Sequence, residues 1–164
     1  MNFTKNLFTK IKDHKSIESQ LAVWRFLSKK IVFTNGCFDL LHPGHLQYLA
    51  EARALGDILI IGLNSDASVK RLKGEHRPIN DEKARGLMLA ALVVVDAVIV
   101  FDEDTPLQLL QLIRPEVLVK GGDYSIETIV GATEILNNGG QVHVLSFMEG
   151  YSTTAIEQRI RNSA

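Results

Sequence analysis

Residues 30–63 read KIVFTNGCFDLLHPGHLQYLAEARALGDILIIGL and contain the pattern strand, helix, strand. Lys30–Asn35 is a β-branched and aromatic run that ends in turn residues, so it predicts a buried strand. Pro43–Leu55 has helical periodicity and is followed by Gly56, which we expect to cap the helix. Asp57–Leu63 is a second apolar run and predicts a second buried strand. We expect the apolar side of the helix to comprise Leu46, Leu49, Ala50 and Ala54.

The same alternation continues towards the C-terminus. Further strands are predicted at Ala97–Phe101, Val117–Lys120 and Gln141–Phe147. Further helices are predicted at Ser65–Leu72, Asp81–Val93, Thr105–Ile113, Ile126–Asn137 and Thr153–Arg161. The strands are nearly continuous apolar runs, which is typical of a parallel sheet covered by helices on both faces. The sequence therefore predicts an α/β domain with a doubly wound, five-stranded parallel sheet. Such sheets bind ligands at the carboxyl ends of their strands.

The first 29 residues are expected to be a helical extension of the α/β core at residues 30–164, within one domain of residues 1–164. Apolar side chains recur there at helical spacing and predict one amphipathic helix after a looser lead-in. These side chains are Ile17, Leu21, Trp24 and Leu27. We expect Trp24 and Phe26 to pack this helix on the domain.

The composition excludes several classes of protein. Hydrophobic residues make up 46% and charged residues 23% of the 164 residues, which excludes disordered and low-complexity chains. The net charge is −1, whereas a protein that coats DNA or anionic membranes would be more basic. The longest apolar run, Leu87–Val95, is too short to span a bilayer, and no secretory signal is visible. The single cysteine, Cys37, cannot form an internal disulfide, so we expect a cytoplasmic protein. From the net charge and the short apolar runs, we expect that it binds neither nucleic acid nor membranes.

The loop after the first predicted strand carries the strongest chemical signal. It reads TNGCFDLLHPGH and places His42 and His45 around Pro43 and Gly44, where a loop enters a helix. A helix N-terminus carries about +0.5 of a charge and free N–H groups, and two imidazoles add donors without bulk. This combination suits a polyphosphate. The alternative is a turn histidine and a surface histidine, but HxGH at this position is rare by chance.

Other strand ends carry further candidate phosphate-binding features. A basic cluster, Lys70, Arg71, Lys73 and Arg77, follows the second strand. KGGDY at Lys120–Tyr124 follows the fourth strand, and YSTT at Tyr151–Thr154 precedes the last helix. Taken alone, each of these features is as consistent with a solvated loop or a helix cap as with a phosphate site. Asp39, taken alone, is as consistent with capping a turn as with contacting a ligand. Their convergence at one edge of the sheet predicts an anion site. No GxGxxG, GxxxxGK[ST], GxSxG or HExxH motif is present.

These motifs resemble the HxGH nucleotidyltransferase superfamily, which has a Rossmann-like fold. Within it, the segments FTNGCFDLLHPGHLQYL, RPIN, EDTP, LVKGGDY and STT are most similar to the D-glycero-β-D-manno-heptose-1-phosphate adenylyltransferases. The similarity covers about Ile17 to Ile160. These enzymes occur free-standing or as the second half of a bifunctional kinase/adenylyltransferase, and the chain length favours the free-standing form. The resemblance implies transfer of AMP from ATP, accompanied by Mg²⁺, to the sugar 1-phosphate, and a homodimer or higher oligomer.

The resemblance also implies roles for individual residues. It implies that the catalytic groups are His42, His45 and Lys73, with Lys70 as the alternative to Lys73. It implies nucleotide contacts by Asn35, Gly36, Phe38, Gly44, Lys120, Gly121, Asp123, Ser152, Thr153 and Thr154, and acceptor contacts by Asp39, Asn64 and Arg85. It names no protein ligand for the metal. Two alternatives stay open: a cytidylyltransferase acting on glycerol 3-phosphate or a similar small phosphate, and a non-catalytic nucleotide-binding module.

Overall fold

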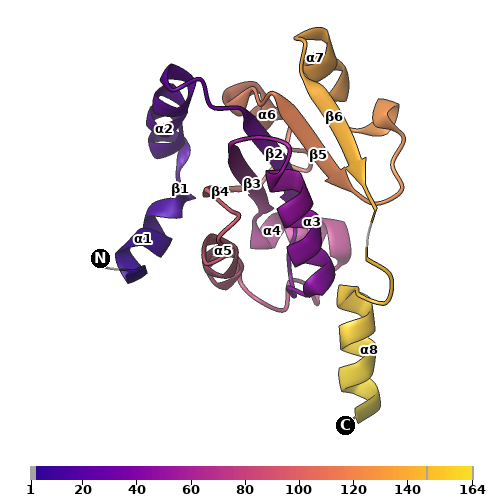
Figure 1. Ribbon diagram of the computed structural model, residues 1–164. Coiled ribbons are helices and arrows are strands. Elements are labelled where there is room, and N and C mark those ends of the chain that lie inside the picture. Colours follow the sequence, from indigo (N-terminus) through magenta and orange to yellow (C-terminus); the bar gives the residue numbers. More distant parts are fainter. Residues whose placement is uncertain (1–2, 147, 164) are drawn as a thin grey trace.

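A parallel sheet with helices on both faces forms the centre of the computed structural model, which describes residues 3–146 and 148–163 (Figure 1). Its six strands run in the order β1-β4-β3-β2-β5-β6, and every neighbouring pair is parallel. The strands are β1 Ile11–Lys12, β2 Ile31–Gly36, β3 Ile58–Asn64, β4 Ala97–Phe101, β5 Val117–Gly121 and β6 Gln141–Leu145. The helices are α1 Phe3–Lys10, α2 His14–Phe26, α3 Pro43–Arg53, α4 Asp66–Lys73, α5 Glu82–Ala90, α6 Leu107–Ile113, α7 Ala132–Asn137 and α8 Thr153–Ser163, with a 3₁₀ turn at Ile126–Thr128.

Two apolar layers hold the helices on the sheet. Alternate strand residues point to opposite faces, so Phe33 of β2 joins one layer and Val32 joins the other. Helices α2, α6 and α7 pack on the first face, and α3 and α5 on the second. The chain winds outwards in both directions from β2, so the crossovers reverse between β2 and β5. This is the switch point at which open α/β sheets form their ligand crevice.

The sequence predicted this fold class correctly, and the sheet has one strand more than the five predicted. The additional strand, β1, has only two residues and lies at the sheet edge beside β4, where Ile11 pairs with Val98. Two residues are too few to show a strand periodicity in sequence. The chain before Lys30 therefore supplies a strand and two helices rather than one helix. Ile17 and Leu21 are buried and Trp24 packs on the core as expected, but Phe26 is 87% exposed, so its expected packing was wrong.

Two further helix predictions need correction. The stretch Ile126–Asn137 is not one helix, because Gly131 has φ +82° and separates the 3₁₀ turn from α7. In α3, the predicted apolar side was misplaced, and only Leu49 of the expected four residues is buried. The buried residues of α3 are Gly44, Tyr48, Leu49 and Ala52. The predicted end of the Gln141–Phe147 strand at Phe147 lies outside the described residues.

Gly56 does not cap α3, which ends at Arg53 with Ala54 as its C-cap. It is instead a point of close approach to β2. A Cβ at Gly56 would lie 2.7 Å from the Lys30 carbonyl oxygen and 2.7 Å from Val32 Cγ2. The tight connection between α3 and β3 thus depends on the absence of a side chain.

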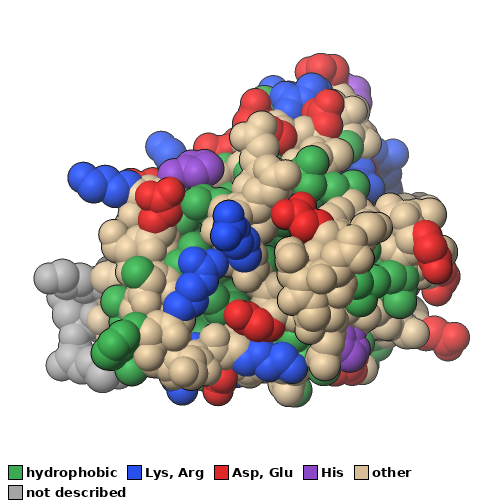
Figure 2. All heavy atoms as spheres, turned by 90° about the horizontal axis from the view of Figure 1, so that it is seen from above, with side chains coloured by type: hydrophobic (Ala, Val, Ile, Leu, Met, Phe, Trp, Pro, Cys, Tyr) green, Lys and Arg blue, Asp and Glu red, His purple; other side chains and the backbone are tan. Residues whose placement is uncertain are grey.

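The face seen from above in Figure 2 carries basic, acidic and apolar side chains interspersed among the residues drawn in colour. Across residues 3–146 and 148–163, no helix is long and apolar enough to cross a membrane.

We predict that Gly56→Ala lowers the free energy of unfolding by about 1–3 kcal/mol, because the added methyl group meets backbone that must shift. Gly86→Ala in α5 is the matched control. A Cβ at Gly86 would lie at an ordinary 3.6 Å from Leu63 Cδ2, so alanine there should stabilise the helix by up to about 1 kcal/mol. Urea denaturation of the two variants measures both changes, and equal stability of the two would contradict the close-approach role.

Candidate active site

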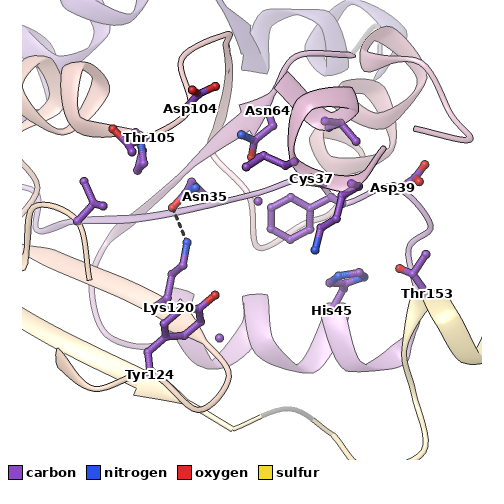
Figure 3. A pocket seen from close by; sticks show the side chains of 18 of the residues that line it. Asn35, Cys37, Asp39, His45, Asn64, Asp104, Thr105, Lys120, Tyr124 and Thr153 are labelled. Carbon is purple, nitrogen blue, oxygen red and sulfur yellow. Dashed lines mark hydrogen bonds between the residues drawn. The ribbon is translucent and has the colours of Figure 1, made fainter. Parts of the chain in front are cut away.

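A cavity of about 690 Å³ opens at the carboxyl ends of β2, β3 and β5. This volume lies in the range of small-molecule sites. Figure 3 shows His45 and Thr153 on one side of the cavity, and Asn35, Lys120 and Tyr124 on the other. The predicted site residues that line it are Asn35, Gly36, Phe38, Asp39, His45, Asn64, Lys73, Lys120, Gly121, Thr153 and Thr154. Five predicted residues do not line it: His42, Gly44, Arg85, Asp123 and Ser152.

His42 and His45 form a stacked pair at the start of α3. His42 is the N-cap, Pro43 opens the helix, and the His45 amide donates to the His42 carbonyl at 2.9 Å. The two rings lie 3.8 Å apart at 24°, and the Phe38 ring lies 5.3 Å from His45. Gly44 belongs to this packing, since a Cβ there would lie 3.1 Å from His42 Nδ1. His45 therefore faces the cavity, and His42 supports it from behind.

Burial favours the neutral form of both histidines. Burial, together with the neighbouring His42, lowers the pKa of His45 to about 4. Burial also lowers the pKa of His42. Nδ1 of each ring is buried and has no hydrogen-bond partner among the residues that the structure describes. An imidazolium would bring an unpaired N–H to that buried position, whereas the neutral ring with its proton on Nε2 leaves only a lone pair there.

Asp39 anchors the loop that follows α4. Its carboxylate accepts hydrogen bonds from the backbone N–H groups of Ile79, at 2.7 Å, and Asn80, at 3.1 Å. It also accepts from Arg77 Nη1 at 2.8 Å. The side chain is 7% exposed, so its capacity to accept is largely used within the protein. Asp39 thus borders the cavity mainly as a support for the Arg77–Asn80 loop.

Arg85 was expected to contact the acceptor, but its guanidinium is fully buried behind the cavity. It donates to the Asn80 carbonyl at 3.0 Å, the Cys37 carbonyl at 2.6 Å and Asp66 Oδ1 at 2.8 Å. All three acceptors belong to the protein, and the fully buried side chain does not line the cavity. The expectation of a direct acceptor contact was wrong, because the sequence does not indicate on which side of the loop the arginine lies.

The opposite side of the cavity holds a half-buried cation. Lys120 Nζ donates to Asn35 Oδ1 at 3.1 Å and lies 5.7 Å from the centre of the Tyr124 ring. Burial lowers the pKa of the Lys120 ammonium. Its hydrogen-bond partner is a neutral amide, so the charge remains available to an anionic ligand. Lys73, which is exposed on the loop side, also borders the cavity.

The start of α8 completes the site. Thr153 and Thr154 line the cavity, whereas Ser152 caps the helix by accepting a hydrogen bond from the Ala155 amide at 3.0 Å. Ser152 is therefore a structural cap, as the alternative interpretation held. Asp123 is exposed and lies outside the cavity lining, where its neighbour Tyr124 is found instead. Asn64 lines the cavity, but its amide nitrogen donates to Ser68 Oγ at 3.0 Å.

Sequence reasoning did not assign roles to several lining residues. Asp104, Thr105 and Pro106 come from the EDTP segment, which contributes to the resemblance but has no role assigned from sequence. Tyr48 reaches the cavity from α3 and shares a 2.6 Å hydrogen bond with Thr34. Burial raises the pKa of Tyr48 to about 12. Tyr48 was not predicted to face the core or the cavity, because the predicted apolar side of α3 was misplaced.

The described residues contain no group of three or more His, Cys, Asp or Glu side chains placed to hold a metal ion. A divalent cation that accompanies a nucleoside triphosphate belongs to that substrate, because its ligands include the phosphate oxygens.

The profile of the "Cytidylyltransferase-like" family matches residues 33–159. The chain belongs to the cytidylyltransferase-like family. The matched span begins in β2 and ends in α8, so it contains the HxGH loop, both lysines of the cavity and the α8 threonines.

Curated relatives are similar over most of this chain. "Bifunctional protein HldE" from Syntrophotalea carbinolica is 53% identical over 152 residues, which is 93% of this chain and 31% of the relative. The HldE protein of Rhodopseudomonas palustris is 57% identical over 142 residues, 87% of this chain and 29% of the relative. The chain thus spans about a third of the length of these relatives.

Two solved structures have a similar fold. The lipopolysaccharide core biosynthesis protein from Thermoplasma volcanium has a TM-score of 0.59 and 30% identity, over 76% of this chain and 99% of that chain. Pantoate-beta-alanine ligase from Francisella tularensis has a TM-score of 0.61 over 92% of this chain and 76% of that chain. At 13% identity, the ligase supports the fold alone.

We predict that Arg85→Met lowers the free energy of unfolding by about 2–4 kcal/mol, because it leaves buried carbonyls and Asp66 without their donor. Arg71→Met is the control. Arg71 pairs with Asp102 and Asp104 at the surface, so its loss should leave stability close to wild type. Urea denaturation compares the two variants, and an Arg85→Met protein as stable as Arg71→Met would show that the guanidinium is dispensable.

We predict that binding of a triphosphate to this site takes up protons. The anion raises the pKa of His45 above its value of about 4 in the free protein. At a pH between these two pKa values, the complex therefore binds more protons than the free protein does. Affinity should then fall as pH rises through the raised pKa and be independent of this group below about pH 4. Calorimetry in two buffers of different ionisation enthalpy counts the protons. His45→Gln supplies the baseline, and equal uptake by both proteins would contradict the prediction.

Proposed function

We propose that this chain transfers AMP from ATP to D-glycero-β-D-manno-heptose 1-phosphate and releases pyrophosphate and ADP-heptose. The observation that carries the proposal is the neutral, stacked pair His42–His45 at the N-terminus of α3, with His45 facing a cavity that also receives Lys73, Lys120 and Thr153. Neutral donors, a helix N-terminus and lysines form an environment suited to two phosphate-bearing substrates.

The acceptor and the base are supported by similarity. Relatives named HldE are 53% and 57% identical over most of this chain, and one protein of similar structure is a lipopolysaccharide core biosynthesis protein. The KGGDY and EDTP segments resemble those of heptose adenylyltransferases and favour ATP. The family description favours CTP, and with it glycerol 3-phosphate or a similar acceptor, as the second candidate. A cytoplasmic location and a homodimer or higher oligomer remain predictions.

The reaction we propose is a direct in-line displacement. A phosphate oxygen of the acceptor forms a bond to the α-phosphorus of the nucleotide, and the bond from that phosphorus to the bridging oxygen breaks. Pyrophosphate leaves with the electron pair. The nucleophile is already an anion at neutral pH, so the step needs neither a general base nor a covalent intermediate.

The residues of the chain then have three tasks. Nε2–H of His45 donates to the phosphate oxygens on which charge develops, and His42 fixes the orientation of that ring through stacking. Lys73 and Lys120, which both line the cavity, reduce the repulsion between the two anionic substrates. Thr153 and Thr154 offer hydroxyl groups to the triphosphate, which enters with Mg²⁺ as its counterion.

We predict that His45→Ala lowers kcat about 10²–10³-fold, by analogy with the loss of other preorganised donors. His14→Ala is the matched control, because His14 is exposed at the start of α2 and should not affect turnover. Steady-state release of pyrophosphate measures both variants. A His45→Ala protein with wild-type turnover would remove the basis of the assignment.

The test of the overall proposal is pyrophosphate release with Mg²⁺ and the heptose 1-phosphate, run in parallel with ATP and with CTP. Release with ATP alone is expected. Release with CTP alone would keep the chemistry but favour the cytidylyltransferase candidate. Binding of a nucleotide without release, also with glycerol 3-phosphate, would favour a non-catalytic module.

A further inference from the structure

Helix α8 is weakly attached to the body of the protein. Figure 1 shows it extending away from the sheet beyond the ends of the strands. None of its residues is buried, and only Thr153 and the segment 155–157 are half-buried. Its first turn nevertheless supplies two residues to the cavity, Thr153 and Thr154. Some interaction must therefore hold this end of the helix in place.

A charged bridge supplies that attachment. Within the described residues, the side-chain hydrogen bonds of α8 reach the rest of the protein through one pair, in which Arg77 Nη2 donates to Glu157 Oε2. Through Nη1, the same guanidinium donates to Asp39 Oδ2 at 2.8 Å. The side chains of Arg77 and Glu157 are 17% and 28% exposed, so the pair is partly shielded from solvent. A shielded, charge-assisted pair is stronger than one at an open surface.

The bridge connects α8 to the histidine loop. Asp39 lies three positions before His42 and is itself fixed by the amides of Ile79 and Asn80. Glu157 lies one helical turn after Thr153 and Thr154, on the same helix. The guanidinium of Arg77 therefore joins the two segments that face the triphosphate in the proposed reaction.

We infer that Glu157, acting through Arg77, is a positioning residue that holds the start of α8 at the phosphate side of the cavity. For its effect on ATP, this inference rests on the function proposed above. Two roles for Glu157 have opposite consequences. If it were only an anion near the site, its neutralisation would reduce repulsion and lower KM for ATP. As a positioning residue, its neutralisation raises that KM, because the threonines lose their placement.

The kinetic test compares Glu157→Gln with Arg161→Ala. Arg161 donates to the other oxygen of Glu157 at 2.7 Å but is 76% exposed and lies outside the cavity, so its loss leaves the bridge to Arg77 intact. For Glu157→Gln we expect KM for ATP to rise about five- to tenfold, with kcat and KM for the acceptor within about twofold of wild type. Arg161→Ala should match the wild type in all three constants. An unchanged or lower KM for ATP in Glu157→Gln overturns the inference.

A second measurement does not depend on the reaction. Hydrogen exchange of the α8 backbone reports how often the helix leaves its docked position. Glu157→Gln should exchange its amides at residues 155–157 about five- to tenfold faster than the wild type, whereas Arg161→Ala should not. Equal exchange in both variants overturns the inference. If the wild type releases no pyrophosphate, the proposed reaction fails, and this exchange comparison alone decides whether the bridge holds α8.

Discussion

The buried guanidinium of Arg85 joins the separate segments from which the cavity is made. One side chain donates to the loop after β2, to the loop that carries Arg77 and Asn80, and to the start of α4. Each of these segments leaves the sheet at a different point, and loops of this kind are mobile unless their backbone groups are paired. The planar, permanently charged fork of arginine presents five N–H donors in a fixed geometry, and here it satisfies three acceptors at once. Asp39 continues the same network towards Arg77 and α8.

The charges of the cavity are arranged around this support. Cations that are paired within the protein, Arg85 and Arg77, serve the architecture, whereas Lys120 meets only a neutral amide and Lys73 is exposed. Burial favours the neutral form of both histidines, because it makes their charged form costly. In the free protein, the positive charge of the cavity therefore comes mainly from Lys73 and Lys120 and not from the histidines. A bound anion would favour the charged form of His45 and so oppose the effect of burial.

Much of the fold could be predicted from sequence because long apolar runs such as Asp57–Leu63 have one interpretation, a strand buried on both faces. The two-residue strand at Ile11 was missed because its pairing with Val98 comes from tertiary structure and leaves no local pattern. The HxGH loop predicted a phosphate site because the chemistry of the residues and their position after a strand agree. Arg85 and Asp39 were assigned to the ligand because a polar residue near a strand end looks the same whether its partners are protein or substrate. Only the hydrogen-bond partners distinguish these two cases.

The central claim is that the nucleotidyl group passes directly from the triphosphate to the acceptor phosphate. The site aligns the two substrates and stabilises charge without forming a covalent bond to either. The configuration at the α-phosphorus tests this most directly. The chain would be supplied with heptose 1-phosphate and a single diastereomer of ATPαS, and the configuration of the product read by ³¹P NMR. We predict inversion, the outcome of one in-line displacement. Retention would require two displacements through a nucleotidyl–enzyme intermediate and would contradict the account.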